Sequence, residues 1–427
     1  MKNKYLIIGN SAAAIGAIEA IRQKDKQGKI ILVSDEPYPA YSRPLISYLL
    51  AGKVDEEKMF YRAQSFYGEN EVEALLGEQV ISVFPSEKKV KLRNGKRISY
   101  TQLLIATGGK SIVPEVKGGN LKGIFTFTTW DDAKKIKAFI DKNKVKKTTV
   151  IGGGLIGLKA AEALIELGMK VTIVELADRV LSATFDREAS AIIEAALKEV
   201  DCRLIARNTV EDIRGKKGKV NSILLRDKKG LPADLIIFAI GVTPNMAVVK
   251  DSGIKINRGI LVNSRMRTNL PRIYAAGDVA EAYDFLLHAH RPIPIWPNAY
   301  KQGSIAGYNM SGADREYRGS FAMNSVELCG VPTISVGITD PKQDGYEIIR
   351  ESNPARKQYK KIVLKDNRIV GAIFINDIDR AGIITGLIKD EVEVSSFKDH
   401  LMREDFGLIS LPKEYRKHLV TGAGIEV

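Results

Sequence analysis

Short apolar runs alternate with longer mixed segments from the start of the chain. The run KYLIIGN (4–10) is typical of a buried strand, SAAAIGAIEAIRQ (11–23) of a helix with small residues near its start, and KIILVSDE (29–36) of a second apolar strand. A strand, a helix and a second strand within about thirty residues form a βαβ unit, which is half of a doubly wound α/β fold.

The same pattern returns in the middle of the chain. There TTVIGGG (148–154) predicts a strand, LIGLKAAEALIELG (155–168) a helix, and MKVTIVE (169–175) a second strand. The repeat predicts a second Rossmann-like domain.

Three further apolar strands end in turns that contain glycine. They lie in YTQLLIATGGKSIVP (100–114), ADLIIFAIGVTPN (233–245) and PRIYAAGDVAE (271–281). The simplest topology that uses all these pieces inserts the second Rossmann domain into the first. The predicted limits are residues 1–114 and 244–320 for the discontinuous first domain and residues 115–243 for the inserted domain.

The pattern changes from residue 321 onward. Short alternating segments such as TISVGIT (333–339) predict strands, and KKIVLKDNRIVGAIFI (360–375) predicts a hairpin that turns at Asp366 and Asn367. The stretch DIDRAGIITGLIKD (377–390) is typical of a helical segment. Residues 321–427 are therefore predicted to form a smaller α+β interface domain, so the fold class is α/β with two Rossmann-like domains and a C-terminal α+β domain.

Composition and charge describe an ordinary globular protein with a basic surface. Among 427 residues, 65 Lys and Arg exceed 51 Asp and Glu, which gives a net charge of +14. The excess is spread along the chain, so it indicates either a solvated basic surface or a preference for anionic partners. Apolar runs are too short to cross a bilayer, and Glu19 and Arg22 interrupt the N-terminal run, so we expect a cytoplasmic protein with no membrane segment.

Cysteine and histidine residues offer little chemistry. Cys202 and Cys329 stand in EVDCRLI and ELCGVP, where they are typical of a strand start and a packed turn. His288 and His290 in LLHAHRP are not accompanied by a carboxylate or a cysteine, so the pair is more typical of packing or of the surface than of a metal site. We predict no metal.

The second glycine motif, GGGLIG, carries the features of a dinucleotide site. Gly152 suits the tight turn after the strand, Gly154 lets the backbone approach a pyrophosphate, and Gly157 lets the helix pack against the strand. Glu175, at the end of the next strand, can accept hydrogen bonds from ribose hydroxyls and would repel a 2′-phosphate. This favours NAD(H), while Arg179 keeps NADP(H) open as the less favoured alternative.

The opening motif is a modified version of the same turn. Gly9 keeps the first glycine, Ser11 replaces the second with a small residue whose hydroxyl can donate to a phosphate, and Ala14 is small enough for helix packing. Asp35, with Glu36 beside it, supplies an acid near the end of the next strand.

Taken in order, the motifs resemble a known superfamily over nearly the whole chain. They are GNSAAA, DEPYPAYSRPLISYLLAGK, ATGG, GGGLIG, AIGVTPN, YAAGDVAE and PIWPNAYKQGSIAGYNM. The chain is similar to FAD-dependent pyridine nucleotide-disulfide oxidoreductases, within them to rubredoxin reductases and the flavin modules of NAD(P)H-dependent nitrite reductases.

The resemblance implies which positions hold the two cofactors. For FAD they are Gly9, Ser11, Ala14, Asp35, Glu36, Arg43, Ala106, Thr107, Gly108, Gly277, Asp278, Pro297 and Ala299; for NAD(H) they are Gly152, Gly154, Gly157, Glu175 and Gly241. Asp278 would bind the ribityl hydroxyls, and a helix following it would point its N-terminus at FAD. Trp296 and Tyr300 suit either a flavin-side stack or the core.

Two departures from the family bear on the chemistry. The loop AYSRPLISYLL (40–50) and the first helix contain no cysteine, so reduction of disulfides, coenzyme A disulfides or peroxides through a thiolate is excluded. Where many relatives pair a helix glutamate with a loop lysine near the flavin, this chain has Lys159 and Tyr48. We hypothesise that Lys159 stabilises the anionic reduced flavin; the alternative is a lysine on the exposed flank of its helix.

The resemblance implies an FAD-dependent NAD(P)H oxidoreductase. NADH would give hydride to FAD, and electrons would then pass to a small acidic iron–sulfur carrier such as a rubredoxin or ferredoxin. The alternatives are an NADH oxidase that uses oxygen, and a flavoprotein subunit or interaction module of a larger redox complex. A homodimer is plausible, and we expect no nucleic-acid partner because aromatic and basic residues are not interleaved.

Overall fold

The computed structural model describes residues 3–412. Two compact units make up the chain. Unit 1 combines the N-terminal part up to Val174 with Asn208–Ala322, and unit 2 combines Glu175–Arg207 with the part from Met323 onward.

A parallel five-stranded sheet forms the first core of unit 1. Its order is β19-β7-β1-β2-β3, with β1 at Lys4–Ile8, β2 at Lys29–Ser34, β3 at Val72–Leu76, β7 at Gln102–Ile105 and β19 at Ile273–Ala275. Helix α1 (Ala12–Lys24) connects β1 to β2. Strands β1, β2, β7 and β19 are almost entirely buried, as expected for a parallel sheet covered on both faces, whereas the edge strand β3 is only partly buried. The predicted first βαβ unit is confirmed.

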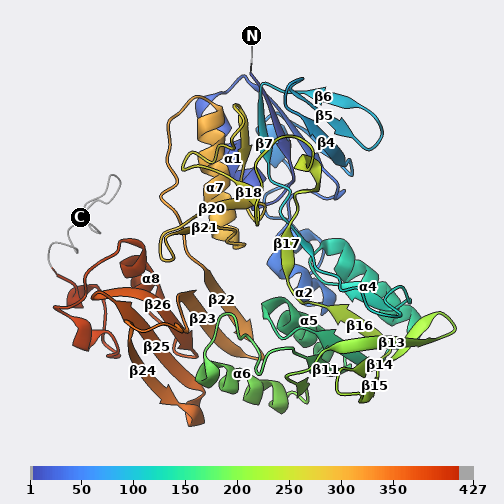
Figure 1. Cartoon of the computed structure of the whole chain (residues 1–427), viewed down its shortest axis with the longest axis vertical. Coiled ribbons are helices and arrows are strands. Elements are labelled where there is room, and N and C mark those ends of the chain that lie inside the picture. Colours follow the sequence, from blue (N-terminus) through green and yellow to red (C-terminus); the bar gives the residue numbers. More distant parts are fainter. Residues whose placement is uncertain (1–2, 413–427) are drawn as a thin grey trace. The chain divides into compact units, whose positions relative to one another are not determined.

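Helix α1 packs closely on α7 (Trp296–Met310), and the two lie side by side in Figure 1. Glycines permit this close approach. A Cβ added at Gly303 would lie 1.9 Å from the carbonyl oxygen of Ala13, and one at Gly307 would lie 2.5 Å from that of Ala17. Larger side chains would force the helices apart, so α7 is held directly against the helix that follows the first glycine turn.

A second parallel arrangement surrounds β10 (Lys147–Ile151). It pairs with β11 (Lys170–Val174) on one side and with β16 (Leu235–Phe238) on the other, and β9 (Ile124–Thr126) pairs with β16. Helix α5 (Leu155–Glu166) follows β10. The second predicted βαβ unit is thus also confirmed.

The chain leaves the first sheet after β7 and returns to it at β19. On the way out it forms β8 (Gly109–Ser111), and on the way back β17 (Val242–Pro244), and these two strands pair antiparallel. The predicted fold class is confirmed. The domain limits stay predictions, because the compact units divide the chain at other points: residues 175–207 join unit 2.

The remaining elements of unit 1 are shorter. Its helices include α2 (Ile46–Leu50), α3 (Phe66–Glu69) and α4 (Trp130–Asn143). Three small sheets contain β4 (Val80–Phe84), β5 (Lys89–Leu92) and β6 (Arg97–Ser99); β13 (Val210–Lys216), β14 (Lys219–Leu225) and β15 (Gly230–Pro232); and β18 (Ile260–Leu261), β20 (Ala280–Asp284) and β21 (Ala289–Arg291).

Unit 2 contains an antiparallel sheet of order β22-β23-β26-β25-β24. The strands are β22 (Met323–Leu328), β23 (Val331–Gly337), β24 (Glu347–Asn353), β25 (Gln358–Lys365) and β26 (Arg368–Ile375). Asp366 and Asn367 have φ of 50° and 57° between β25 and β26, which confirms the predicted hairpin turn. Helix α8 (Ala381–Lys389) packs on β26.

Buried polar contacts join this sheet to α6 (Arg187–Glu199), which precedes β12 (Arg203–Ile205). Asp186 caps α6 by accepting a bond from the Ala189 amide at 3.0 Å. The same carboxylate accepts bonds from Lys361 Nζ at 2.8 Å and the Tyr359 hydroxyl at 2.6 Å, both on β25. All three side chains are buried, so segment 175–207 is attached to the C-terminal sheet. None of the described helices is long and apolar enough to cross a membrane.

Candidate functional site

The two glycine motifs form the same strand-to-helix turn. Gly9 and Gly152 both have φ of +110°, a conformation that L side chains rarely adopt. A Cβ at Gly9 would lie 2.1 Å from the carbonyl oxygen of Ala106, and one at Gly152 would lie 2.4 Å from that of Ala239. In both turns the glycine thus meets the end of the neighbouring parallel strand, and no larger residue fits.

The second small residue of each motif is the N-cap of the following helix. The Ser11 side chain makes no capping bond to α1, so its hydroxyl can donate to a ligand. A Cβ added at Gly154 would meet no described atom within 4 Å, which leaves open space in front of α5. The first turns of both helices lack acidic residues. Their positive ends therefore suit the phosphates of FAD and NAD(H).

The third small residue of each motif sets the helix against its strand. Ala14 is fully buried. A Cβ at Gly157 would lie 2.0 Å from the carbonyl oxygen of Gly152. The predicted packing reason for small residues at these two positions agrees with this geometry.

The acidic residues after β2 and β11 are not in equivalent positions. Ile8 pairs with Val33 in the first sheet, and Ile151 pairs with Val174 in the second, so Ser34 is the counterpart of Glu175. Asp35 is one residue further on and is exposed.

Glu36 is held within a polar cluster. Its carboxylate accepts a bond from the Tyr41 hydroxyl at 2.5 Å and forms an ion pair with Arg43. Arg43 also donates to the carbonyl oxygen of Thr128 at 3.1 Å. Of the two adjacent acids, Asp35 is the exposed one and Glu36 orients Arg43.

Asp278 is half-buried in the turn after β19. Burial raises the pKa of its carboxyl group, while the nearby guanidinium of Arg43 acts in the opposite direction. The neighbouring Gly277 amide donates to Gln302 Oε1 of α7 at 2.9 Å. A half-buried carboxyl group at the carboxyl edge of the first sheet suits hydrogen bonding to the hydroxyls of a bound cofactor.

The prediction of a helix directly after Asp278 is wrong. Strand β20 begins at Ala280 and pairs with β21 and β18. Ala280, Glu281 and Ala282 are all buried in this strand. The helix nearest this turn is α7, which begins with Trp296 and the exposed Pro297, while Ala299 is buried.

Hydrogen bonds join the segment that follows β7 to the segment that follows β16. The Thr107 hydroxyl donates to the carbonyl oxygen of Asn245 at 2.7 Å, and the Asn245 amide donates to Gly108 at 2.8 Å. Gly241, with φ of +114°, accepts a bond from the Ile112 amide at 3.0 Å. Together with Ala106, these residues line the carboxyl edges of β7 and β16.

Lys159 and Tyr48 lie in contact between α5 and α2. Lys159 Nζ is 4.8 Å from the centre of the Tyr48 ring and 2.5 Å from Glu162 Oε2. The Lys159 side chain is only 19% exposed, so it does not lie on an exposed flank of the helix. A second lysine, Lys53, has its Nζ 6.0 Å from the centre of the Tyr48 ring and pairs with Glu166 at 2.5 Å. The structure thus brings together the two substituted positions that the sequence singled out.

An aromatic cluster beside this region was not predicted. The Tyr38 ring stacks on Trp130 with ring centres 4.6 Å apart, and its hydroxyl donates to Asp131 at 2.5 Å. Trp130, Asp131 and the capping residue Thr129 lie more than eighty positions after Tyr38, and their separation hides the contact from local sequence patterns.

The remaining candidates take structural roles. Trp296 is half-buried against the Tyr61 ring, with centres 4.9 Å apart, and the Tyr300 hydroxyl donates to Glu19 at 2.5 Å. His288 Nδ1 lies 3.2 Å from the Tyr283 hydroxyl. Within residues 3–412 no group of three or more His, Cys, Asp or Glu side chains is arranged to hold a metal.

Both cysteines lie away from these turns in sequence. Cys202 is buried directly before β12, and burial raises the pKa of its thiol to about 12. Cys329 stands in the turn between β22 and β23. Their predicted placement at a strand start and in a turn is confirmed.

Comparison with known proteins agrees with this geometry. Residues 3–303 match the family model described as pyridine nucleotide-disulphide oxidoreductase, and residues 323–392 match that of the rubredoxin NAD+ reductase C-terminal domain. The nitrite reductase [NAD(P)H] of Bacillus subtilis is 31% identical over 92% of this chain, which spans only 48% of that protein. The epsilon subunit of the NADH-dependent phenylglyoxylate dehydrogenase of Aromatoleum evansii is 30% identical over 93% of this chain and 94% of that subunit.

Among solved structures, the NADH:rubredoxin oxidoreductase of Clostridium acetobutylicum is 28% identical, with a TM-score of 0.75 over 93% of this chain and 98% of that one. The resemblance stated from the motifs is therefore confirmed, and the predicted cofactors, FAD and NAD(H), are those of the matched family. The chain belongs to the pyridine nucleotide-disulphide oxidoreductase family.

Proposed function

We propose that the protein is a cytoplasmic FAD-dependent oxidoreductase that takes hydride from NADH and delivers electrons to a small acidic iron–sulfur carrier. The observation that carries the proposal is the combination of two dinucleotide turns with a C-terminal domain that matches rubredoxin NAD+ reductases. Bound FAD would supply the redox chemistry, accepting a hydride and releasing electrons one or two at a time.

The first glycine turn would hold the ADP half of FAD. The N-terminus of α1 and the Ser11 hydroxyl would bind the phosphates, and the exposed carboxylate of Asp35 would bind the ribose. Arg43, oriented by Glu36, and Asp278 would hold the remainder of the cofactor. The other predicted FAD residues, Ala106 to Gly108, Gly277, Pro297 and Ala299, shape the surrounding backbone.

The second glycine turn would hold NADH. The N-terminus of α5 would bind the pyrophosphate in the open space at Gly154. Glu175 accepts a bond from the Ala177 amide at 2.7 Å, which orients its carboxylate for the ribose hydroxyls.

Lys159 and Tyr48 are proposed to act where hydride passes between the cofactors. The Tyr48 ring and the Glu162 carboxylate hold the Lys159 ammonium in place. A fixed cation there would stabilise the negative charge of the reduced flavin. A preorganised charge in a site that is partly shielded from water needs little reorganisation.

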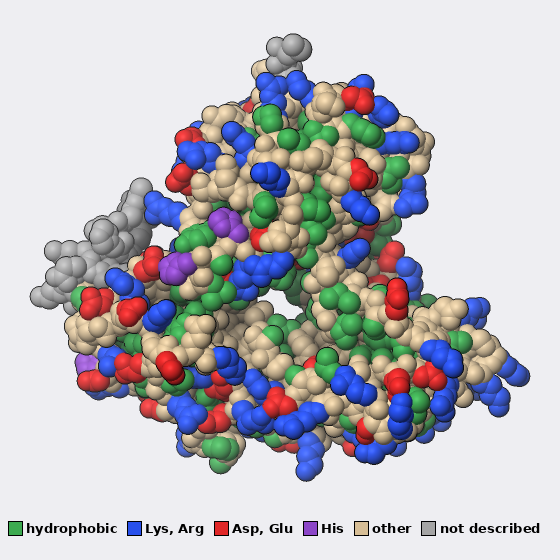
Figure 2. All heavy atoms as spheres, in the orientation of Figure 1, with side chains coloured by type: hydrophobic (Ala, Val, Ile, Leu, Met, Phe, Trp, Pro, Cys, Tyr) green, Lys and Arg blue, Asp and Glu red, His purple; other side chains and the backbone are tan. Residues whose placement is uncertain are grey.

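The chain offers no thiolate relay between the cofactor and its acceptor. Loop 40–50 lacks cysteine, and the Cys202 thiol is buried with a raised pKa. Electrons would therefore leave directly from the cofactor edge. Lys and Arg side chains are spread over the face shown in Figure 2, and a net charge of +14 would attract an acidic carrier over long range.

A second candidate is an electron-input subunit of a larger redox complex, in place of a free-standing homodimer. It is favoured by the match over 94% of a dehydrogenase subunit and by the match to about half of a longer nitrite reductase. Size-exclusion chromatography of the native protein from its own cells, compared with the purified chain, separates the two.

Stopped-flow spectroscopy of the purified FAD-loaded protein tests the main proposal. We expect NADH to bleach the flavin faster than NADPH, and rubredoxin or ferredoxin to reoxidise it at a rate that falls steeply as salt rises from 0.05 to 0.5 M, on the order of tenfold. Reoxidation by oxygen alone, insensitive to salt, would instead support the NADH oxidase alternative. A protein that cannot be loaded with FAD would overturn both.

A further inference from the structure

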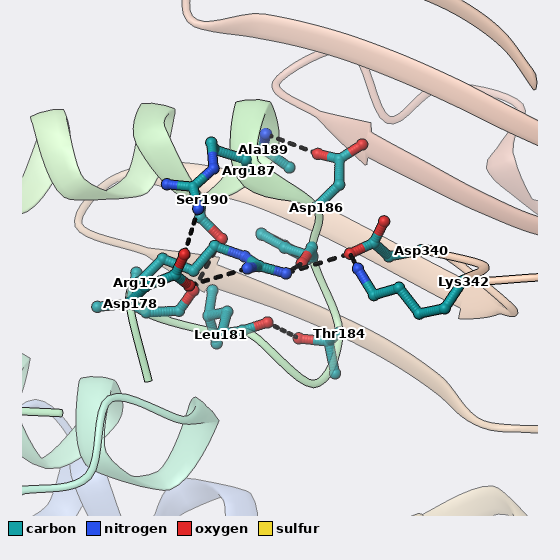
Figure 3. A network of polar contacts seen from close by, with 12 residues as sticks. Asp178, Arg179, Leu181, Thr184, Asp186, Arg187, Ala189, Ser190, Asp340 and Lys342 are labelled. Atoms are coloured by element: carbon teal, nitrogen blue, oxygen red, sulfur yellow. Dashed lines mark hydrogen bonds and ion pairs between the residues drawn. The ribbon is translucent and has the colours of Figure 1, made fainter. Parts of the chain in front are cut away.

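Glu175 is followed by a cluster of opposite charges within unit 2. Two carboxylates, Asp178 and Asp340, are surrounded by four cations: Arg179, Arg187, Arg207 and Lys342. Figure 3 shows Arg179 reaching from the loop before α6 to Asp340, which lies beyond β23. The cluster thus begins three residues after the proposed ribose-binding acid.

Backbone bonds fix this loop beside Glu175. The Glu175 amide donates to the carbonyl oxygen of Ile205 at 2.9 Å, and the Arg207 amide donates to that of Ala177 at 2.8 Å. The arginines therefore belong to the same ordered surroundings as the Glu175 carboxylate. In Rossmann domains an acid at this place binds the ribose of NAD, whereas a nearby arginine accommodates the 2′-phosphate of NADP.

The terminal nitrogens of Arg179 already have three hydrogen-bond acceptors. Its Nη1 lies 3.0 Å from Asp178 Oδ1, and its Nη2 lies 3.1 Å from Asp340 Oδ2 and 3.3 Å from the carbonyl oxygen of Phe185. Its side chain is 15% exposed. Asp340 also pairs with Lys342 at 2.5 Å.

Asp178 binds two further arginines. Arg187 forms an ion pair with it, and Arg207 Nη2 lies 3.8 Å from Asp178 Oδ2. Although its burial acts to raise the pKa of Asp178, bonds from Arg187 and Arg179 lower it below the ordinary value. Asp178 is therefore an ionised partner for every arginine of the cluster.

We infer that Asp178 and Asp340 enforce the preference for NADH by occupying Arg179, the arginine that a 2′-phosphate would need. To bind the phosphate, Arg179 would have to leave both carboxylates, and each carboxylate would lose one of its cationic partners in a partly enclosed site. Such an exchange gains little, because one anion replaces another at the same guanidinium. Because Asp340 comes from the C-terminal domain, that domain takes part in choosing the nucleotide. The inference rests on the proposed function, namely that the protein binds NADH.

Isothermal titration calorimetry of the FAD-loaded protein tests this without turnover. The probes are ADP-ribose and its 2′-phosphorylated form, which differ only in the phosphate. The variants are Asp340→Asn and the double change Asp178→Asn with Asp340→Asn, which keep the side-chain shapes. In the double variant we expect the phosphorylated probe to bind about tenfold more tightly than in the unaltered protein, while ADP-ribose changes less than about twofold.

Two controls separate the inference from general charge effects. Asp201→Asn removes one exposed negative charge from the same unit and should leave both affinities unchanged. Adding Arg179→Gln to the double variant should abolish the gain, because the freed guanidinium is then absent. Circular dichroism and the thermal midpoint check that each variant is folded.

The outcomes are distinguishable. If the double variant still discriminates against the phosphorylated probe as the unaltered protein does, or if Asp201→Asn produces the same gain, the inference is wrong. A gain that survives Arg179→Gln contradicts it too. If ADP-ribose fails to bind the unaltered protein, the proposed function fails instead.

Discussion

The buried ion pair between Asp186 and Lys361 gives a quantitative test of how segment 175–207 is held to the C-terminal sheet. Lys361→Met keeps the length of the apolar stem but removes the ammonium. The two side chains are 10% and 4% exposed, so Asp186 would be left as a buried charge. Loss of one partner of a buried pair costs about 3–5 kcal/mol. Because the Tyr359 hydroxyl and the Ala189 amide still donate to Asp186, we expect the lower end, about 3 kcal/mol.

Native-state hydrogen exchange suits this test, because a protein with two compact units has no single unfolding free energy. The amides of α6 and β25 should exchange about a hundredfold faster in the variant, which is the ratio that about 3 kcal/mol produces. Lys357→Met is the matched control. Lys357 stands between β24 and β25 and forms an ion pair with Glu199 of α6, but both of these side chains are more exposed. A surface pair contributes at most about 1 kcal/mol, so exchange should rise less than about fivefold.

The pH dependence of the same hydrogen exchange tests the contribution of Asp186 to stability independently. Burial acts to raise the pKa of Asp186, but hydrogen bonds from Lys361 and Tyr359 lower it below its ordinary value in the folded protein. The stability it contributes is present above its unfolded pKa, near 4, and is lost as the pH falls through the lower folded value. In Lys361→Met the loss should begin at a higher pH. Equal exchange in Lys361→Met and Lys357→Met at neutral pH would refute the reasoning.

Three shorter predictions concern the cofactor turns. Gly9→Ala should abolish the flavin absorbance of the purified protein, because the new Cβ would lie 2.1 Å from the Ala106 carbonyl oxygen. The control is Gly95→Ala, at a glycine with φ of +89° and open surroundings. This variant should lose only about 1 kcal/mol of stability and keep its flavin absorbance. Glu175→Ala should weaken NADH binding about tenfold in a fluorescence titration, since hydrogen bonds to a charged acceptor contribute about 1.5–3 kcal/mol. Lys159→Glu should lower the flavin midpoint potential by on the order of 30 mV in a dye-coupled titration. An unchanged potential would show that Lys159 does not stabilise the reduced flavin.

Local patterns were sufficient to predict the two turns, because their requirements are short-range. Gly9 is essential for its φ and for the Ala106 contact, whereas Ser11 and Ala14 need only be small. A motif that loses two glycines therefore keeps the geometry as long as the first one stays. The Asp366–Asn367 hairpin was predictable for the same reason, since both turn residues tolerate positive φ.

One prediction carried over from the family was wrong. A helix was expected after Asp278, but the structure has β20 there, which pairs with β18 and β21. The Lys159 and Tyr48 positions, by contrast, were identified by the resemblance alone. Their contact depends on how α2 packs on α5, which no periodicity within either segment specifies.

Arg179 shows why nucleotide preference was left open by the sequence. An arginine four residues after Glu175 leaves both nucleotides open, because an acid at this place binds the ribose of NAD whereas a nearby arginine accommodates the 2′-phosphate of NADP. Asp178 is next to Arg179 in the sequence, but Asp340 lies 161 positions after Arg179. Only the folded unit 2 places that second carboxylate within 3.1 Å of the guanidinium. Asp340, on which the inferred nucleotide preference depends, thus belongs to a different predicted domain from the nucleotide motif, and the motif alone does not reveal it.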